Sequence, residues 1–430
     1  MNTLTDWLIH LESLHPKGQG GIELGLERVN RVKALLRQEA RCPLIIVGGT
    51  NGKGSTCAYL EAIYRAAGYR VGCYTSPHLL DYNERIRVDG VPVDEPPLCA
   101  AFARVEAARR AGGNVALTYF EFGTLAAWEV FAARQVEALI LEVGLGGRLD
   151  AVNAYDADCA VITGIALDHT DWLGSTREAI GFEKSGIYRA GIPGLCADPD
   201  PPRSLIDHAQ AIGADLRLIG RDFGYQDAGQ QWSFWARGSG GRTELPHPAL
   251  RGGYQLRNAA AVLAAIESLA DRLPVSTSAI AQGLRAAELP GRFDVLPRAA
   301  GAPTIVLDVA HNPQAVAAFA ENLAALGPCA QTIAVVGMLA DKDIAGALGA
   351  LAGKVDVWLL AGLDVARGAP AELLAGVVGT QQLGGRIECF ASPAEAFVRA
   401  ASLAGEDDRI AVFGSFHTVA AVLRAVKRGT

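Results

Sequence analysis

Residues 44–56 read LIIVGGTNGKGST, and this stretch determines the fold class that the sequence predicts. An apolar run leads into a glycine-rich turn, after which a lysine and two hydroxyl side chains open a segment with helical spacing. Successive backbone N–H groups in such a turn, together with the positive end of the following helix, attract an anion. Lys53 is expected to reach terminal phosphates and a hydroxyl to bind magnesium, so ATP is the predicted ligand. A turn that uses its glycines only for packing is the alternative.

The first part of the chain alternates runs rich in Val and Ile with Ala-rich segments, which is typical of a parallel sheet covered by helices. The pattern predicts strands at residues 44–48, 70–74, 138–143 and 159–164, and helices at 56–67 and 122–134. Residues 221–246 alternate aromatic residues and glycine with polar residues, which indicates a small antiparallel meander. A further helix is expected at 258–269.

A second alternating unit follows a cluster of proline and glycine at residues 289–303, where we expect the domain boundary. Its strands are predicted at residues 304–309, 332–336, 355–360 and 409–413. The predicted fold is therefore α/β with two domains. Residues 1–294 would form a P-loop NTPase-like parallel sheet with a small antiparallel insertion, and residues 295–430 a Rossmann-like α/β domain.

Composition limits the compartment and the partners. The 430 residues include 39 Lys and Arg against 46 Asp and Glu, a net charge of −7, so neither nucleic acid nor an anionic membrane is an expected partner. The eight cysteines include no C-x-x-C pair, which favours a reducing, cytoplasmic location. The first residues lack the basic and apolar regions of a secretory signal, and no apolar run reaches the length of a membrane span.

Three polar residues follow predicted strands or lie on a predicted helix. Glu142 should emerge at the carboxyl edge of the sheet, where open α/β sheets bind ligands, and could hold magnesium there. A strand-end carboxylate with only a structural role is the alternative. His169 follows another strand, although a lone histidine is more often a hydrogen-bonded loop residue. Lys184, beside Glu183, would by itself be interpreted as a solvated side chain.

Gly54 separates Lys53 from Ser55, which departs from the usual P-loop spacing. The form GTNGKGST resembles the loop of folylpolyglutamate and dihydrofolate synthases, which belong with the Mur peptide ligases among ATP-dependent amide-forming enzymes. Further segments match in order along nearly the whole chain: TSPHL at 75–79, ER at 84–85, TYFE at 118–121, EVGLGGRLDA at 142–151, DHT at 168–170, EKSGI at 183–187, LPGR at 289–292, DVAHNP at 308–313, DKD at 341–343 and GSFHTV at 414–419. The match is most similar to the bifunctional bacterial type.

This resemblance implies a set of nucleotide, metal and catalytic residues. Those near ATP are Thr50, Asn51, Gly52, Lys53, Gly54, Ser55, Asn258, Arg292 and Asp308. Those implied to hold two magnesium ions are Ser55, Ser76, Glu142, His169 and Lys184, the last carboxylated by carbon dioxide. The implied catalytic residues are Lys53, Glu142, His169, Lys184, Arg292 and His311. Carboxylation of Lys184 needs a deprotonated amine and hence a lysine that is shielded from solvent. For Arg292, an ordinary salt bridge in the linker is the structural alternative.

The resemblance also implies residues for the two other substrates. The residues that match the pterin site are Gly21, Ile22, Glu23, Leu24, Thr118, Tyr119, Phe120, Glu121, Leu149, Asp150 and Ala151. Phe120 or Tyr119 could stack on a flat heterocycle, although such aromatic residues are more often part of a core. Ser415 and His417 match the side of the site that binds glutamate, but the same run is also an ordinary turn.

The activity implied by the resemblance is ATP-dependent amide formation. The γ-phosphate would pass to a carboxylate of dihydropteroate, and the amine of L-glutamate would displace phosphate from the acyl phosphate. Tetrahydrofolate would be extended through its γ-carboxylate at the same site. A monofunctional folylpolyglutamate synthase, a Mur-type ligase and a nucleotide-dependent switch are the alternatives. A monomer that acts on small molecules is expected.

Overall fold

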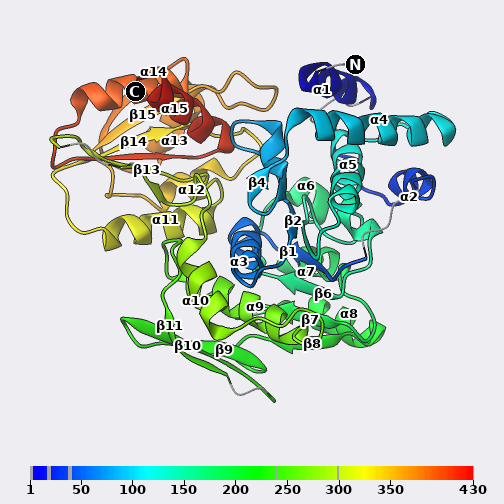
Figure 1. Ribbon diagram of the computed structural model, residues 1–430. Coiled ribbons are helices and arrows are strands. Elements are labelled where there is room, and N and C mark those ends of the chain that lie inside the picture. Colours follow the sequence, from blue (N-terminus) through cyan, green and yellow to red (C-terminus); the bar gives the residue numbers. More distant parts are fainter. Residues whose placement is uncertain (1–2, 17–20, 37–40, 239–240, 298–299, 430) are drawn as a thin grey trace. The chain divides into compact units, whose positions relative to one another are not determined.

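The computed structural model describes residues 3–16, 21–36, 41–238, 241–297 and 300–429. The chain folds into two compact units, which are described separately (Figure 1). Unit 1 comprises Met1–Ala249 and Gln255–Glu288, and unit 2 comprises Leu250–Tyr254 and Leu289–Thr430. The division predicted between residues 294 and 295 lies a few residues beyond the point where unit 2 resumes.

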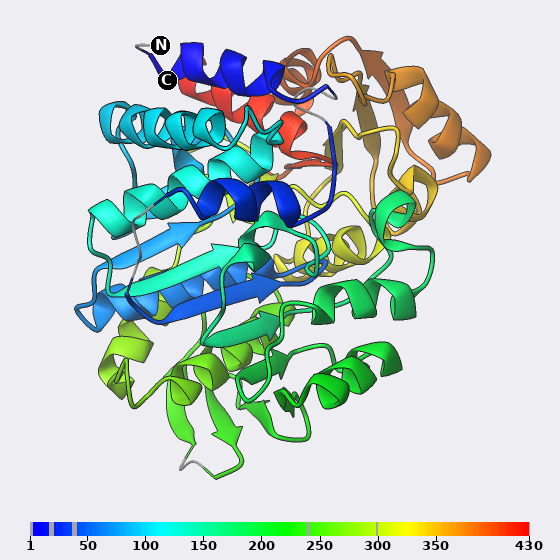
Figure 2. The same ribbon diagram turned by 90° about the vertical axis from the view of Figure 1, so that its right-hand side faces the viewer.

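Unit 1 is built on an eight-stranded sheet in the order β4-β3-β2-β5-β1-β6-β7-β8. The strands are β1 (Leu44–Gly48), β2 (Val71–Tyr74), β3 (Ile86–Val88), β4 (Val91–Pro92), β5 (Ala138–Glu142), β6 (Cys159–Ile162), β7 (Pro193–Cys196) and β8 (Asp215–Leu218). The six strands from β2 to β8 in this order run parallel, and Figure 2 shows several of them side by side. Every residue of β1 and β5 is buried, as expected for strands with both faces covered.

The helices of unit 1 cover this sheet. They are α1 (Leu4–Ser13), α2 (Glu27–Lys33), α3 (Lys53–Ala66), α4 (Glu95–Ala111), α5 (Tyr119–Ala133), α6 (Thr170–Leu173), α7 (Arg177–Ser185), α8 (Arg203–Ile212), α9 (Tyr254–Ser268) and α10 (Thr277–Ala286), with short 3-10 turns η1 (Tyr82–Arg85) and η2 (Ala151–Ala154). Helix α3 packs on β1, β2 and β5, and α10 packs on α3. Gly283 permits this approach, because a Cβ there would lie 2.5 Å from the Cα of Ile63.

The predicted antiparallel insertion is present as a separate sheet of β9 (Phe223–Asp227), β10 (Gln231–Ala236) and β11 (Arg242–Pro246). Trp232 and Phe234 alternate with exposed positions along β10 and are buried. Figure 1 shows this sheet beside α9 and α10, and β11 contacts α10. One face of the insertion is therefore buried.

Unit 2 contains a six-stranded sheet in the order β12-β13-β17-β14-β15-β16. Its strands are β12 (Asp294–Val295), β13 (Thr304–Leu307), β14 (Thr332–Val336), β15 (Val357–Ala361), β16 (Arg386–Phe390) and β17 (Arg409–Phe413). Its helices are α11 (Pro313–Ala325), α12 (Ile344–Gly349), α13 (Ala371–Thr380), α14 (Pro393–Leu403) and α15 (Phe416–Gly429). All pairings are parallel except that of β12 with β13. The two-domain α/β prediction is confirmed.

Several elements differ from the predicted ones. Helix α3 begins at Lys53 rather than residue 56, because the helix can start at a glycine-rich turn without a side-chain cap. The sheet of unit 1 also has an antiparallel edge that was not predicted. There β3 and β4 are joined at Asp89 and Gly90, both with positive φ, which is the backbone of a tight hairpin turn. Among the described residues, no helix combines the length and apolar character needed to cross a membrane.

Candidate active site

The loop between β1 and α3 is fixed by the end of the neighbouring strand β6. The Thr50 N–H donates to the Gly164 carbonyl at 2.6 Å, and the Thr163 hydroxyl donates to the Asn51 carbonyl at 2.7 Å. Gly49 has φ +141°, and a Cβ there would lie 2.0 Å from the Thr163 hydroxyl oxygen. Only glycine fits this approach. The predicted phosphate-binding loop is therefore held in one conformation by residues more than a hundred positions away in sequence.

Two lysine side chains converge on one carbonyl of this loop. The Lys53 Nζ donates to the Gly49 oxygen at 2.9 Å, and the Lys184 Nζ donates to the same oxygen at 3.0 Å. Lys184 comes from α7 and is 4% exposed. Burial lowers the pKa of Lys184 to about 7, and the positive charge of Lys53 contributes in the same direction. A lysine that sequence alone would leave in solvent is thus buried and largely able to lose its proton near neutral pH.

Helix α9 lies against the first turn of α3. The Gln255 side-chain amide donates to the Ser55 hydroxyl at 3.3 Å, and the Asn258 amide donates to the Gln255 oxygen at 3.1 Å. A Cβ on Gly52 would lie 2.8 Å from the Asn258 amide oxygen. The structure therefore places Asn258 beside Gly52 of the loop at residues 50–55, with which it was predicted to bind ATP. Gln255 was missed by sequence analysis, although its place one helical turn before Asn258 could have indicated it.

Glu142 ends β5 and is 5% exposed. Its carboxylate accepts a hydrogen bond from the Ser76 N–H at 2.9 Å, so these two predicted metal ligands are neighbours. A partly buried arginine that sequence analysis missed supports Thr75, the residue before Ser76. Arg87, on β3, donates to the Thr75 hydroxyl at 3.1 Å and pairs with Glu61 of α3 at 2.9 Å. The Ser76 segment is therefore tied to the helix that follows the phosphate-binding loop.

His169 lies between β6 and α6 in a left-handed backbone conformation, with φ +52°. The backbone N–H of His169 donates to the carboxylate of Asp168 at 2.9 Å. Two residues hold the start of this segment: Arg177 donates to the Ile165 carbonyl at 3.0 Å, and Asp198 accepts from the Ile165 N–H at 2.7 Å. Positive φ is uncommon for residues other than glycine, and these hydrogen bonds hold the segment in a defined shape.

The predicted metal ligands do not form a cluster of His, Cys, Asp and Glu among the described side chains. In that part of the chain, no group of three or more His, Cys, Asp or Glu residues could hold a metal ion. The predicted set includes only two such residues, Glu142 and His169, and depends otherwise on hydroxyl oxygens and Lys184. A carboxylated Lys184 would supply the missing anionic oxygens, and its burial and lowered pKa fit that modification. The donor set therefore fits divalent cations that prefer oxygen ligands, provided that Lys184 is modified.

Unit 2 places its predicted residues at the carboxyl edge of its own sheet. Asp308 follows β13, and its carboxylate accepts from the N–H groups of Phe293 and Ala310 at 2.9 and 2.8 Å. Burial raises the pKa of Asp308 to about 6, although the charge of Arg292 opposes the shift. The Arg292 guanidinium lies 4.8 Å from the centre of the Phe416 ring. The His311 Nδ1 lies 2.8 Å from the Val309 carbonyl oxygen.

Ser415 and His417 lie at the start of α15 and have different surroundings. The Ser415 hydroxyl accepts from the Thr418 N–H at 3.1 Å and lies 2.8 Å from the Thr418 hydroxyl, so it caps the start of α15. Burial lowers the pKa of His417, and the nearby charge of Arg367 adds to this shift. The Ser415 contacts are those of the ordinary structural turn that the sequence also allowed.

Two residues of the segments that resemble a pterin site, Leu24 and Leu149, line a cavity of about 440 Å³ in unit 1. Its lining residues are Leu24, Gly25, Leu26, Glu27, Arg28, Asn30 and Leu149. Leu24 and Leu149 belong to the predicted pterin set, whereas the other nine residues of that set are not among the lining residues. Most of the lining comes from residues 24–30.

The other residues of the predicted pterin set have varied surroundings. Thr118 and Glu121 form a capping box at the start of α5. Tyr119 is buried, and its ring centre lies 5.8 Å from that of Tyr82. Phe120 packs on Gly144, where a Cβ would lie 2.8 Å from the ring. Asp150 precedes Ala151 and caps η2, and burial raises the pKa of Asp150 to about 7.

Comparison with known proteins gives consistent matches. Residues 291–416 match the family described as "Mur ligase, glutamate ligase domain". The chain is 45% identical to the dihydrofolate synthase/folylpolyglutamate synthase of Escherichia coli over 98% of this chain and 95% of that protein. The corresponding protein of Haemophilus influenzae is 37% identical, with 97% and 96% covered. The chain belongs to the dihydrofolate synthase/folylpolyglutamate synthase family.

Solved structures of these synthases match the whole fold. E. coli FolC in complex with DHPP and ADP superposes with a TM-score of 0.92 at 44% identity, covering 99% of this chain and 98% of that one. A bifunctional synthase from Yersinia pestis, complexed with AMPPNP and a manganese ion, gives a TM-score of 0.89 at 44% identity, with the same coverage. The chain is therefore an ATP-dependent ligase of the Mur superfamily, as the sequence predicted.

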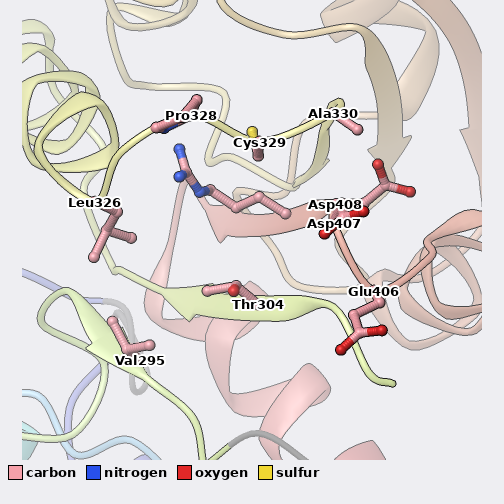
Figure 3. A pocket seen from close by; sticks show the side chains of 10 residues that line it. Val295, Thr304, Leu326, Pro328, Cys329, Ala330, Glu406, Asp407 and Asp408 are labelled. Carbon is pink, nitrogen blue, oxygen red and sulfur yellow. The ribbon is translucent and has the colours of Figure 1, made fainter. Parts of the chain in front are cut away.

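A second cavity, of about 560 Å³, lies in unit 2 at the amino ends of β13 and β17 (Figure 3). Three acidic side chains, Glu406, Asp407 and Asp408, lie on the side opposite Val295 and Leu326. Parallel α/β sheets bind their ligands at the carboxyl ends of the strands, so this cavity is at the wrong edge for the synthase site. The guanidinium of Arg409, which also lines it, already donates to two backbone carbonyls. This cavity therefore lies outside the candidate site.

Burial of Lys184 should make the protein less stable at neutral pH than a variant without that charge. Its folded-state pKa is below the unfolded value, so protonation opposes folding below about pH 7, and the cost disappears as the pH rises towards the unfolded pKa. We expect Lys184→Met to be more stable than the parent protein in carbon dioxide-free buffer. This advantage should shrink by about 2 kcal/mol between about pH 7 and about pH 9. Urea unfolding at each pH measures it, and a constant difference would contradict a buried, shifted lysine.

Proposed function

We propose that this chain joins L-glutamate to dihydropteroate to make dihydrofolate, and adds further glutamates to tetrahydrofolate through the γ-carboxylate. The observation that carries the proposal is the convergence of Lys53 and the buried Lys184 on the Gly49 carbonyl, in a loop of the predicted phosphate-binding type. The relatives named for both reactions support this assignment. The structures named with ADP, AMPPNP, manganese and L-glutamate support ATP, a divalent metal and glutamate as ligands.

The proposed nucleotide and metal residues belong mainly to unit 1. Residues 50–55 and Asn258 would bind the phosphates and the nucleoside, and Arg292, Asp308 and His311 would contribute from unit 2. Two magnesium ions would be held by Ser55, Ser76, Glu142, His169 and Lys184, the last as its carbamate. When bound, these ions would neutralise charge on the phosphates. Because one chain supplies all five proposed ligands, the proposal needs no second copy and assumes a monomer.

The proposed reaction has two steps. A carboxylate oxygen of the acceptor attacks the γ-phosphorus of ATP, the bond to ADP breaks, and an acyl phosphate forms. The α-amine of L-glutamate then attacks the acyl carbon, inorganic phosphate leaves with the bonding electrons, and the amine loses a proton. Lys53 and the backbone N–H groups of residues 50–54 would stabilise charge on the transferring group, which is how most phosphoryl-transfer sites work. Arg292 would bring a planar cation to the same charge.

The acceptor and glutamate sites are proposed from the surroundings of the matching segments. The cavity of about 440 Å³ beside Leu24 and Leu149 would accept the pterin, and Phe120 packs on Gly144, close in sequence to Glu142. Ser415 and His417 would lie near glutamate, with Ser415 also serving as a helix cap. The eight cysteines are all free thiols, which fits the reducing conditions of the cytoplasm, where we place the protein.

The test compares acceptors with purified protein, ATP, magnesium and L-glutamate. We expect ADP release that depends on an acceptor, together with glutamate addition to both dihydropteroate and tetrahydrofolate by mass spectrometry. Addition to tetrahydrofolate alone would leave a monofunctional folylpolyglutamate synthase. ADP release that does not respond to any acceptor would contradict the ligase and favour a nucleotide-dependent switch.

A further inference from the structure

An ion pair in unit 1 joins α2 to the start of α5. The Arg28 Nη2 lies 3.0 Å from one Glu121 carboxylate oxygen, and the Arg28 Nε lies 3.2 Å from the other. The Glu121 side chain is 5% exposed and the Arg28 side chain 22%. An arginine that binds both oxygens of a carboxylate fixes the orientation of the two groups as well as their distance.

The same guanidinium also holds the segment that precedes α2. Arg28 donates to the Glu23 backbone carbonyl at 2.7 Å and forms an ion pair with the Glu23 carboxylate. Residues 21–26 form neither helix nor strand, so no regular hydrogen-bond ladder fixes their path. On the other side, the Gly25 N–H donates to the Leu149 carbonyl at 3.2 Å. The segment is therefore positioned by individual contacts, which include the ion pair with Arg28 and a contact of 3.1 Å between the His15 Nε2 and the Glu23 carboxylate.

This segment is one wall of the cavity that the proposed function assigns to the acceptor. Leu24, Gly25, Leu26 and Arg28 itself line the cavity, together with Leu149. Glu121 was predicted to bind the substrate, but both of its carboxylate oxygens accept hydrogen bonds from Arg28, and one also accepts from the Thr118 N–H at 2.7 Å. Glu121 is thus directed at Arg28 and at its own helix.

We propose that Arg28 and Glu121 are positioning residues that fix residues 21–26 as the wall of the acceptor cavity. The inference rests on the proposed function, since it assumes that this cavity takes the pterin. It assigns Glu121 an indirect role in place of a substrate contact. It also predicts that weakening the pair changes acceptor binding and leaves the nucleotide site intact.

The test measures dihydropteroate binding, ATP binding and backbone hydrogen exchange in the full-length protein and in Arg28→Lys, which keeps the charge but not the planar fork. We expect Arg28→Lys to weaken dihydropteroate binding at least tenfold, roughly the effect of losing one charge-assisted contact. ATP binding should change less than about twofold, and residues 21–26 should lose exchange protection. Glu121→Gln keeps an acceptor for the Thr118 N–H and provides a second variant if Arg28→Lys does not fold.

A matched control comes from α5, the helix that carries Glu121. Arg104 of α4 pairs with Glu129 of α5 at 2.6 Å, and the Glu129 side chain is 1% exposed, but neither residue lines the cavity. Arg104→Lys should therefore leave dihydropteroate binding and the exchange of residues 21–26 unchanged. Equal loss of binding in Arg104→Lys, or unchanged binding in Arg28→Lys, overturns the inference while the proposed function stands. If the parent protein does not bind dihydropteroate, the proposed function fails and the inference fails with it.

Discussion

Lys53→Ala should lower kcat for glutamate addition by about 10²- to 10³-fold, because a cation aimed at the transferring phosphoryl group is lost. In the structure its ammonium already lies within the loop, bonded to the carbonyls of Gly49 and Thr50. Removing this charge should also raise the pKa of Lys184, since Lys53 is one of the causes of its depression. Steady-state kinetics with saturating ATP and each acceptor measures the loss in kcat.

The control for Lys53 is an exposed lysine outside the site. Lys354 of unit 2 is exposed, so Lys354→Ala should retain the parent kcat. If Lys53→Ala were to keep more than about one-tenth of the parent kcat, the electrostatic role of the loop lysine would be wrong.

Lys184→Met should lower kcat by about 10²-fold or more, because the variant has no amine that carbon dioxide can modify. The parent protein should lose activity in buffer freed of carbon dioxide and recover it when bicarbonate is added. With ¹³C-bicarbonate, the parent should show a carbamate carbon signal that is missing from Lys184→Met. This experiment separates modification of Lys184 from a purely structural role.

Two outcomes would argue against carboxylation. The first is a parent activity that does not depend on bicarbonate. The second is activity retained in Lys184→Arg, which keeps a positive charge beside Gly49. The expected stability gain of Lys184→Met at neutral pH provides an internal check. A variant that is more stable yet inactive cannot owe its low activity to unfolding.

Much of the fold could be predicted from the sequence, because it depends on local patterns. Apolar runs such as residues 44–48 and 332–336 alternate with segments of helical spacing, and a sheet covered by helices is the arrangement that buries both. The phosphate-binding loop was located for a similar reason, since the glycines at 49 and 52 have positive φ that other residues rarely adopt. Edge elements such as β3 and β4 were missed because their few residues carry little periodicity.

The roles of several site residues could not be predicted, because they depend on distant partners. Thr163 meets Gly49, Gln255 meets Ser55, and Arg87 meets Glu61 only after the strands and helices have packed. Sequence analysis placed Glu121 with the substrate because it belongs to a matching segment. In the structure its carboxylate accepts hydrogen bonds from Arg28, 93 positions earlier in the chain. The spacing of Thr118 and Glu121 within one segment indicates a helix cap. It does not indicate that an arginine from another segment forms an ion pair with Glu121.

Lys184 shows which properties of a residue follow from the sequence and which follow only from the tertiary structure. The sequence by itself determined that a lysine stands beside Glu183 on a predicted helix, after a strand, a loop and a histidine in a recognisable order. Only the tertiary structure decided that Glu183 pairs with Arg148 at 2.7 Å while the neighbouring lysine points into the protein, to the carbonyl of Gly49. Adjacent helix positions point about 100° apart, so the Glu183 side chain stays partly exposed while that of Lys184 is buried. The pKa of the amine, and hence its chemistry, follows from that burial.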